Sequence, residues 1–182
     1  MTDPLSQLRI RPMTPADIDA ILEIANTLNH APHWPASAYQ SALDPAATPR
    51  RIALVADDPH TGNLLGFTIS SLLPPQAELE TIAVAAASQR QGVARRLFAA
   101  TLDALTTAQI TDLLLEVRAS NAPALAFYNA LGFATTGGRP RYYADPPEDA
   151  LLLQLRLGSP RPATESAIPG GCTVPGQIST GS

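Results

Sequence analysis

The feature that most constrains the fold is a passage where an apolar run gives way to a basic segment containing a glycine. The run ETIAV, residues 80–84, reads as a strand, and AAASQRQGVARRL, residues 85–97, leads into an amphipathic helix. The first turn of a helix has unpaired backbone N–H groups and a positive dipole, and both favour an anion. Gly92 and Ala94 leave room for an anion, and three arginines add positive charge. The passage therefore predicts a phosphate site between a strand and a helix.

An ordinary helix that begins after a loop would account for the same residues. The sequence contains neither GxxxxGK followed by Ser or Thr nor GxGxxG, which are the signatures of nucleoside triphosphate and dinucleotide sites. A phosphate-containing ligand of another kind is therefore the functional interpretation, and the ordinary helix start remains its alternative.

The pattern of apolar residues predicts seven strands and four helices. We expect strands at residues 8–11, 51–56, 64–72, 78–84, 111–118, 133–136 and 150–157, and helices at 15–28, 35–43, 92–108 and 121–132. This order, with helices between groups of strands, predicts an α/β fold in which helices flank both faces of a mixed central sheet.

Composition narrows the classes of protein that remain. The chain has 182 residues, of which 45% are hydrophobic, so we expect a single domain over residues 1–157. The net charge of −4 disfavours a general nucleic-acid binder. The single cysteine, Cys172, excludes an internal disulfide; with no apolar run of about 18 residues and no signal peptide, we expect a cytoplasmic protein without a membrane span. The Pro-, Gly- and Ser-rich residues 158–182 are predicted to form a disordered tail.

Several motifs, in order, resemble those of the GNAT superfamily of N-acetyltransferases. Residues 89–94, QRQGVA, match its pattern Q/R-x-x-G-x-G/A. Within the superfamily the chain is most similar to the ribosomal-protein-alanine N-acetyltransferases, through HWP (33–35), LEVRASN (115–121), ALAFYNALGF (124–133) and RPRYYADPPEDA (139–150). The resemblance covers residues 8–157 and implies the acetyltransferase (GNAT) fold.

The resemblance implies that the chain binds acetyl-CoA. It assigns the pantetheine arm to backbone groups of Ile82, Ala83 and Val84, and the pyrophosphate to backbone N–H groups of Arg90, Gln91, Gly92, Val93, Ala94 and Arg95. It assigns Asn121 a polar contact with the cofactor, whereas the residues alone favour a helix cap, and both roles can hold. No metal is expected, because the three histidines show no ligand spacing.

Acetyl transfer to an amine needs a proton acceptor and a proton donor. Glu116 lies in the apolar strand LLLEV, next to the point where neighbouring strands should separate, and partial desolvation would make it a better base. The alternative is a structural ion pair with Arg118 or another arginine. The resemblance favours Glu116 as proton acceptor and Tyr128 as proton donor, although Tyr128 could also be a core aromatic residue. Glu80 is the second candidate base, or a contact for the amine.

The acceptor is the least constrained part of the prediction. Trp34 and Tyr142, with Tyr143, are candidates for the acceptor groove or for ordinary packing. An α-amine with a pKa near ~8 is about one-tenth neutral at pH 7, whereas only about one lysine in a few thousand is neutral, so an α-amine needs little help from a base. The subfamily motifs favour the N-terminal alanine of a ribosomal protein, attacked directly in a ternary complex because Cys172 lies outside the motifs. The alternatives are a small-molecule amine (a polyamine, an amino acid or an aminoglycoside) and a non-catalytic CoA-binding domain.

Overall fold

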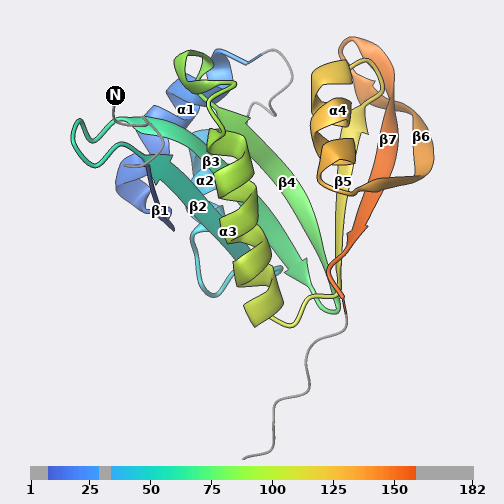
Figure 1. The fold of residues 1–182 in the computed structure, drawn as a ribbon, viewed down its shortest axis with the longest axis horizontal. Helices are drawn as coiled ribbons and strands as arrows, with labels where there is room; N and C mark the ends of the chain where they lie inside the picture. Colours follow the sequence, from blue (N-terminus) through green and yellow to red (C-terminus); the bar gives the residue numbers. More distant parts are fainter. Residues whose placement is uncertain (1–7, 29–33, 159–182) are drawn as a thin grey trace, which may run out of the picture.

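A computed structural model describes residues 8–28 and 34–158, which form one seven-stranded mixed sheet with helices on both faces (Figure 1). The strand order is β1-β2-β3-β4-β5-β7-β6. The predicted fold class is therefore confirmed. The strands are β1 Arg9–Pro12, β2 Arg51–Asp57, β3 Leu64–Leu73, β4 Gln76–Val84, β5 Asp112–Arg118, β6 Ala134–Ala144 and β7 Pro147–Arg156. The helices are η1 Pro15–Asp17, α1 Ile18–Asn26, α2 Ala36–Ala42, η2 Ala86–Ser88, α3 Val93–Thr107 and α4 Ala122–Ala130.

The elements differ from the predicted ones mainly at the C-terminal hairpin. The expected strand 133–136 extends to Ala144 as β6, and its partner β7 begins at Pro147. Most β6 residues are exposed, so this strand lacks the alternation of buried and exposed positions from which a strand is recognised. The short helix η2 has no apolar stripe and was not expected. The predicted tail beyond residue 158 and the histidines His30 and His33 lie outside the described residues.

Strands β4 and β5 separate part way along their length (Figure 1). Their parallel pairing covers only Gln76↔Asp112, Ala77↔Leu113 and Glu78↔Leu114. Beyond these pairs β4 continues with β3, and β5 continues with β7. The β4 edge beyond Glu78 therefore lacks a β5 partner.

The two faces of the sheet carry separate apolar cores. On one face α1 and α2 pack against residues of β2 and β3, including Val55, Phe67 and Ile69. On the other face α3 and α4 pack against β4, β5 and β7 through Phe98, Leu113 and other residues. Burial alternates along β5, so Leu113, Leu115 and Val117 face α3 and α4, whereas Glu116 points to the opposite face.

Gly66 of β3 occupies a position where the backbone leaves no room for a side chain. A Cβ atom there would lie 2.6 Å from the carbonyl oxygen of Ala83 and 3.2 Å from Leu97 Cδ1. We expect Gly66→Ala to lower the free energy of unfolding by about 1–3 kcal/mol, because β3 must move away from β4. Gly137→Ala is the control, since its Cβ would make an ordinary 3.5 Å contact with Leu152. Urea unfolding checks this prediction, and equal losses in the two variants would contradict it.

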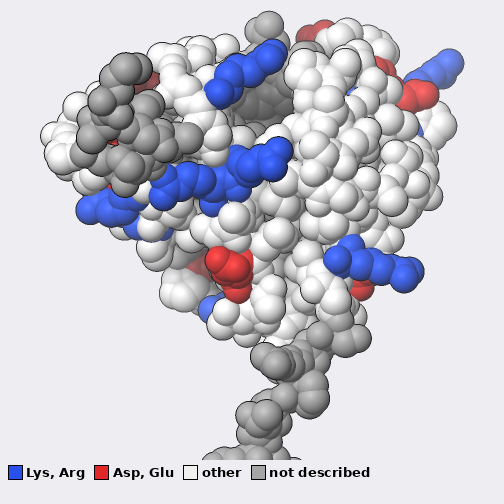
Figure 2. All heavy atoms as spheres, in the orientation of Figure 1, with Lys and Arg blue, Asp and Glu red and all other residues white. Residues whose placement is uncertain are grey.

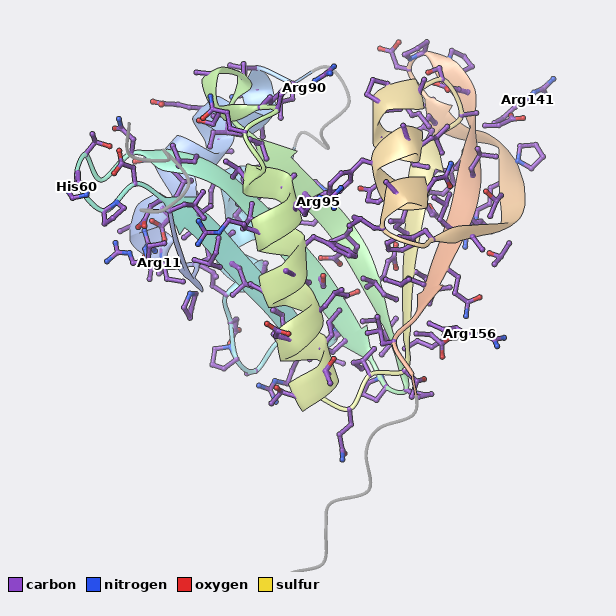
Figure 3. The ribbon with its side chains drawn as sticks, in the orientation of Figure 1. Arg11, His60, Arg90, Arg95, Arg141 and Arg156 are labelled. Carbon is purple, nitrogen blue, oxygen red and sulfur yellow. The ribbon has the colours of Figure 1, made fainter. Side chains whose placement is uncertain are left out.

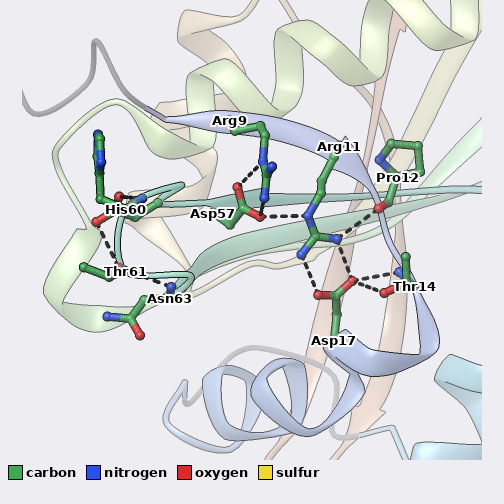
Figure 4. A network of polar contacts seen from close by, with 10 residues as sticks. Arg9, Arg11, Pro12, Thr14, Asp17, Asp57, His60, Thr61 and Asn63 are labelled. Atoms are coloured by element: carbon green, nitrogen blue, oxygen red, sulfur yellow. Dashed lines mark hydrogen bonds and ion pairs between the residues drawn. The ribbon is translucent and has the colours of Figure 1, made fainter.

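An ion-pair network fastens the N-terminal strand to β2 and to the start of the first helix (Figure 4). Arg9 donates two hydrogen bonds to Asp57, at 2.9 and 2.7 Å. Arg11 links two carboxylates, with Nε 2.7 Å from Asp57 Oδ2 and Nη2 2.7 Å from Asp17 Oδ1. The Thr14 backbone N–H and hydroxyl also donate to Asp17, both at 2.8 Å. The network therefore fixes the position where η1 begins.

The network makes stability depend on pH in the acid range. Hydrogen bonds from Arg11 lower the pKa of Asp17 from 3.8 to about 2. Because the folded-state pKa is the lower one, this stabilisation is present above pH 4 and is lost as the pH falls toward 2; its full value is about 2 kcal/mol. We expect Asp17→Asn to be less stable than wild type by about this amount at pH 7, with the gap falling to less than half of that amount by pH 2.5. Urea unfolding at several pH values measures the gap; Asp19→Asn, at an exposed α1 position, is the control. A gap that does not change with pH would contradict the prediction.

Within the described residues, no helix combines the length and apolar character needed to cross a membrane.

Candidate active site

The start of α3 has the geometry of an anion site. Gly92 caps the helix with a left-handed φ of +82°, and no side chain supplies a cap in the described structure. The backbone N–H of Arg96 donates to Gly92 O at 3.1 Å, so the N–H groups of Val93, Ala94 and Arg95 lie ahead of that first helical bond. A left-handed residue followed by a helical one turns successive N–H groups toward one point. This helix start fits a pyrophosphate, and the contact itself stays a prediction.

The loop before α3 is held in shape by its own glutamines. Gln89 Nε2 donates to Val84 O at 3.2 Å, and Gln91 Nε2 donates to Ala87 O at 2.9 Å. Arg90 has a left-handed φ of +61°. The side chains of Gln89 and Gln91 thus bind the loop backbone, which leaves Gln91 only its backbone for the predicted contact with a ligand.

The arginines of this segment serve two purposes. The side chains of Arg90 and Arg95 extend from the region of the helix start toward the side of α4 (Figure 3). Arg96 instead donates to Leu8 O at 3.1 Å and so contacts the residue just before β1. Basic side chains gather on this face of the molecule, around a hollow beside α3 (Figure 2).

The end of β4 has one paired and one open edge. Ile82, Ala83 and Val84 pair with Thr68, Phe67 and Gly66 of β3. On their other side β5 has already diverged. Such an edge offers backbone hydrogen-bonding groups to an extended ligand, as one strand does to another. The predicted pantetheine contacts of these three residues remain predictions.

Glu116 lines a cavity of about 240 Å³ over the last paired residues of β4 and β5, next to the point where the two strands separate. Strands β3 to β7 all contribute to its wall, with Glu78, Glu116 and Arg139 as its charged residues. Only 14% of the Glu116 side chain is exposed, and Arg139 Nη1 lies 3.1 Å from Glu116 Oε1. The carboxylate is therefore both ion-paired and open to a cavity, so the structural and catalytic interpretations are not exclusive.

Arg118, the first expected partner of Glu116, binds elsewhere. Its guanidinium lies 3.2 Å from Glu148 Oε2 and donates to the carbonyl oxygens of Asp145 and Pro146 at 2.8 and 3.2 Å. It also lies 4.1 Å from the centre of the Tyr143 ring. Arg118 therefore holds the turn between β6 and β7, with Tyr143 packed beneath it.

Tyr142 lies beside the cavity and contacts its charged residues. Its hydroxyl donates to the Glu116 carboxylate, and this hydrogen bond, with partial burial, raises the pKa of Tyr142 to about 12. The Arg139 guanidinium lies 5.5 Å from the centre of its ring. Tyr142 is exposed, so it is also accessible to a ligand that enters the cavity.

Tyr128 is buried on the other face of the sheet. It packs against Phe127 and Phe133, with ring centres 5.5 and 5.4 Å apart, in the core beneath α4. Burial raises the pKa of Tyr128 well above its usual value, with a smaller contribution from Tyr143. The phenol therefore stays protonated at neutral pH. The predicted donor and acceptor therefore project from opposite faces of the sheet.

Three other predicted residues have clear structural partners. Asn121 caps α4, its Oδ1 accepting a hydrogen bond from Ala124 N at 3.2 Å. Trp34 packs against Tyr39, with ring centres 5.5 Å apart. Arg51 holds Glu80 with two hydrogen bonds, at 2.8 and 3.0 Å. These contacts favour the packing interpretation of Trp34 and weaken Glu80 as a base.

The structure adds Glu78 and Arg139 to the candidate residues. Glu78 is the last β4 residue paired with β5, and burial, followed by the charges of Glu116 and Glu80, raises its pKa. Arg139 reaches the cavity from β6. The available signals were the position of Glu78 just before the ETIAV run and the place of Arg139 in the RPRYY motif. Neither signal specifies that both side chains face Glu116.

Comparison with known proteins supports the same assignment. The profile of the acetyltransferase (GNAT) family matches residues 18–133. Ribosomal protein bS18-alanine N-acetyltransferase of Escherichia coli K12 is 41% identical over 98 residues, 53% of this chain, and the chain spans 66% of the length of that enzyme. A putative bS18-alanine N-acetyltransferase of Bacillus subtilis is 30% identical over 148 residues, which are 81% of this chain and 95% of the relative.

A solved structure extends the likeness to the whole described fold. The crystal structure of the ribosomal-protein-S18-alanine N-acetyltransferase from Escherichia coli superposes with a TM-score of 0.73 at 30% identity, over 88% of this chain and 99% of that one. The resemblance inferred from the motifs is confirmed. The chain belongs to the acetyltransferase (GNAT) family.

Proposed function

We propose that this protein transfers the acetyl group of acetyl-CoA to the α-amine of an N-terminal alanine of a ribosomal protein. The names of the similar bacterial enzymes support this acceptor. The uncapped start of α3 and the open edge of β4 fit the pyrophosphate and the pantetheine arm of the cofactor. An enzyme that modifies ribosomal proteins would act in the cytoplasm, so we propose this location for the protein.

The amides of Val93, Ala94 and Arg95 would bind the pyrophosphate, with Arg90 and Arg95 adding positive charge. The backbone of Ile82, Ala83 and Val84 would align the arm along β4 and direct its thioester into the gap beside β5. Acetyl-CoA supplies an activated acetyl group, so no covalent enzyme intermediate is needed.

Two side chains would move the protons. Glu116 accepts the proton of the attacking nitrogen as the new amide bond forms, and Tyr128 donates its proton to the sulfur as the thioester bond breaks. A proton returns from solvent to Tyr128 and leaves Glu116, so that an amide and a free thiol are the products. Glu116 lines the cavity beside β4 and β5, and Tyr128 lies in the core beneath α4.

The observation that carries the proposal is the position of Glu116 in a cavity next to the point where β4 and β5 part. It is tested by offering acetyl-CoA and a panel of acceptors to the purified protein: peptides with different first residues, polyamines and aminoglycosides. Mass spectrometry then locates the acetylated nitrogen. We expect fastest transfer to the α-amine of peptides that begin with alanine. Faster acetylation of a lysine side chain or of a small amine would overturn the proposed acceptor.

A further inference from the structure

The cavity beside Glu116 holds two carboxylates and a single guanidinium. Glu78 and Glu116 both line it, and Arg139 pairs with Glu116 at 3.1 Å. The nearby Glu80 is already paired with Arg51 at 2.8 Å. Among the described residues, none forms a hydrogen bond or an ion pair within 4.0 Å with the Glu78 carboxylate. The cavity therefore has one carboxylate more than it has cations.

The Arg139 guanidinium occupies the position beside Glu116 that the amine of the acceptor must take. A proton acceptor has to lie within about 3 Å of the nitrogen it serves, and Arg139 Nη1 occupies such a position beside Glu116 Oε1. The Arg139 side chain is 57% exposed, and pairs with one exposed partner are weak and easily exchanged. Its remaining contact in the cavity region is the face of Tyr142, at 5.5 Å from the ring centre.

We propose that Arg139 is a displaceable counter-ion of Glu116: the ammonium group of the acceptor takes its place, and the displaced guanidinium moves to Glu78. This inference rests on the proposed role of Glu116. Before the acceptor arrives, Arg139 forms the ion pair with the Glu116 carboxylate. After it arrives, two carboxylates hold two cations, and the ammonium lies against Glu116. Glu116 passes the ammonium proton to solvent and, as a carboxylate again, accepts the second proton when the neutral amine attacks. Arg139 is thus a positioning residue that favours charged amines over neutral groups.

The inference predicts the effect of removing Arg139 on acceptor binding. With CoA bound, we expect Arg139→Gln to bind an alanine-initiated peptide about two- to fivefold more tightly than wild type, because the ammonium no longer competes with a guanidinium. Binding of the same peptide with an acetylated N-terminus should not change. Arg139→Lys should restore wild-type affinity. Arg156→Gln removes the same charge from an exposed β7 position paired with the start of β5, and is the matched control (Figure 3). Calorimetry measures all of these affinities without turnover.

A double-mutant cycle tests the part assigned to Glu78. Glu78→Gln should weaken binding of the amine peptide about two- to fivefold in the wild-type background, because the displaced guanidinium loses its partner. In the Arg139→Gln background the same change should have no effect. Glu23→Gln, at an exposed position of α1, is the control for the change in net charge.

Each contrary result overturns the inference. Weaker binding of both peptides by Arg139→Gln would make Arg139 a structural residue, and weaker binding of the free amine alone would make it a direct contact of the acceptor. An equal effect of Glu78→Gln in both backgrounds would exclude Glu78 as the residue that binds the displaced guanidinium. If wild type prefers another amine of the panel, only the proposed acceptor fails, and the cycle is run with that amine. If no charged amine binds, both proposals fail.

Discussion

Replacing Glu116 with glutamine is expected to lower kcat about a hundred- to ten-thousandfold, the usual contribution of a positioned general base. Glutamine keeps the shape of the side chain but cannot accept the proton of the attacking amine. The cofactor-binding groups at the start of α3 and along β4 are untouched, so the Kd for acetyl-CoA should stay within about twofold of wild type. Steady-state kinetics and calorimetry give the two quantities on the same preparation.

The control for this variant lies on the same strand and the same face. Asp112→Asn also removes a carboxylate from β5, but at the end of the strand where β4 and β5 are still paired. It should retain kcat within a few-fold. If Glu116→Gln and Asp112→Asn have similar kcat values near that of wild type, Glu116 is not the proton acceptor.

Replacing Gly92 with glutamate is expected to weaken acetyl-CoA binding at least about a hundredfold, the loss of two or more hydrogen bonds to a charged group. Two physical effects act together. The φ of +82° strains any residue with a Cβ, which disturbs the start of α3. The new carboxylate would also occupy the helix start itself and repel the pyrophosphate.

A second glycine separates these effects. Gly62 has a similar φ of +72° but lies in the turn between β2 and β3, where a Cβ atom would have no neighbour within 4 Å. Gly62→Glu therefore introduces the same backbone strain and the same negative charge, but away from the start of α3. It should lose stability yet bind acetyl-CoA as wild type does. Equal Kd values for the Gly62 and Gly92 variants would show that the start of α3 does not hold the pyrophosphate.

The parts of the fold that could be predicted are those with a strong periodic pattern. Strand β5 alternates half-buried and buried residues from end to end, and α3 begins beside Gly92, where the small residue and the dipole argument placed it. Strand β6 could not be predicted in full, because hydrogen bonds to β7 hold it together and few of its side chains are buried. Glu80 is an extra residue in β4, since Thr81 pairs with Ile69 and Leu79 pairs with Ser70, the next residue of β3. This bulge does not alter the pattern of apolar residues and could not be predicted from it.

The sequence indicated which residues form the candidate site but not how their side chains pair with one another. The position of Glu116 at the parting of two strands follows from the motif order, whereas its pairing with Arg139 depends on how β6 folds back over β7. Arg118 was the nearer candidate partner in sequence and is held instead by Glu148. Contacts between distant strands depend on register, which local sequence does not specify when most residues are exposed.

The most direct test of the account is a crystal structure of the protein with CoA and an acceptor peptide bound together. We predict that the pyrophosphate oxygens accept hydrogen bonds from the backbone of Val93, Ala94 and Arg95, and that the CoA sulfur lies in the gap between β4 and β5 with the peptide amine beside Glu116. A pyrophosphate bound away from the start of α3, or an amine bound out of reach of the Glu116 carboxylate, would contradict it.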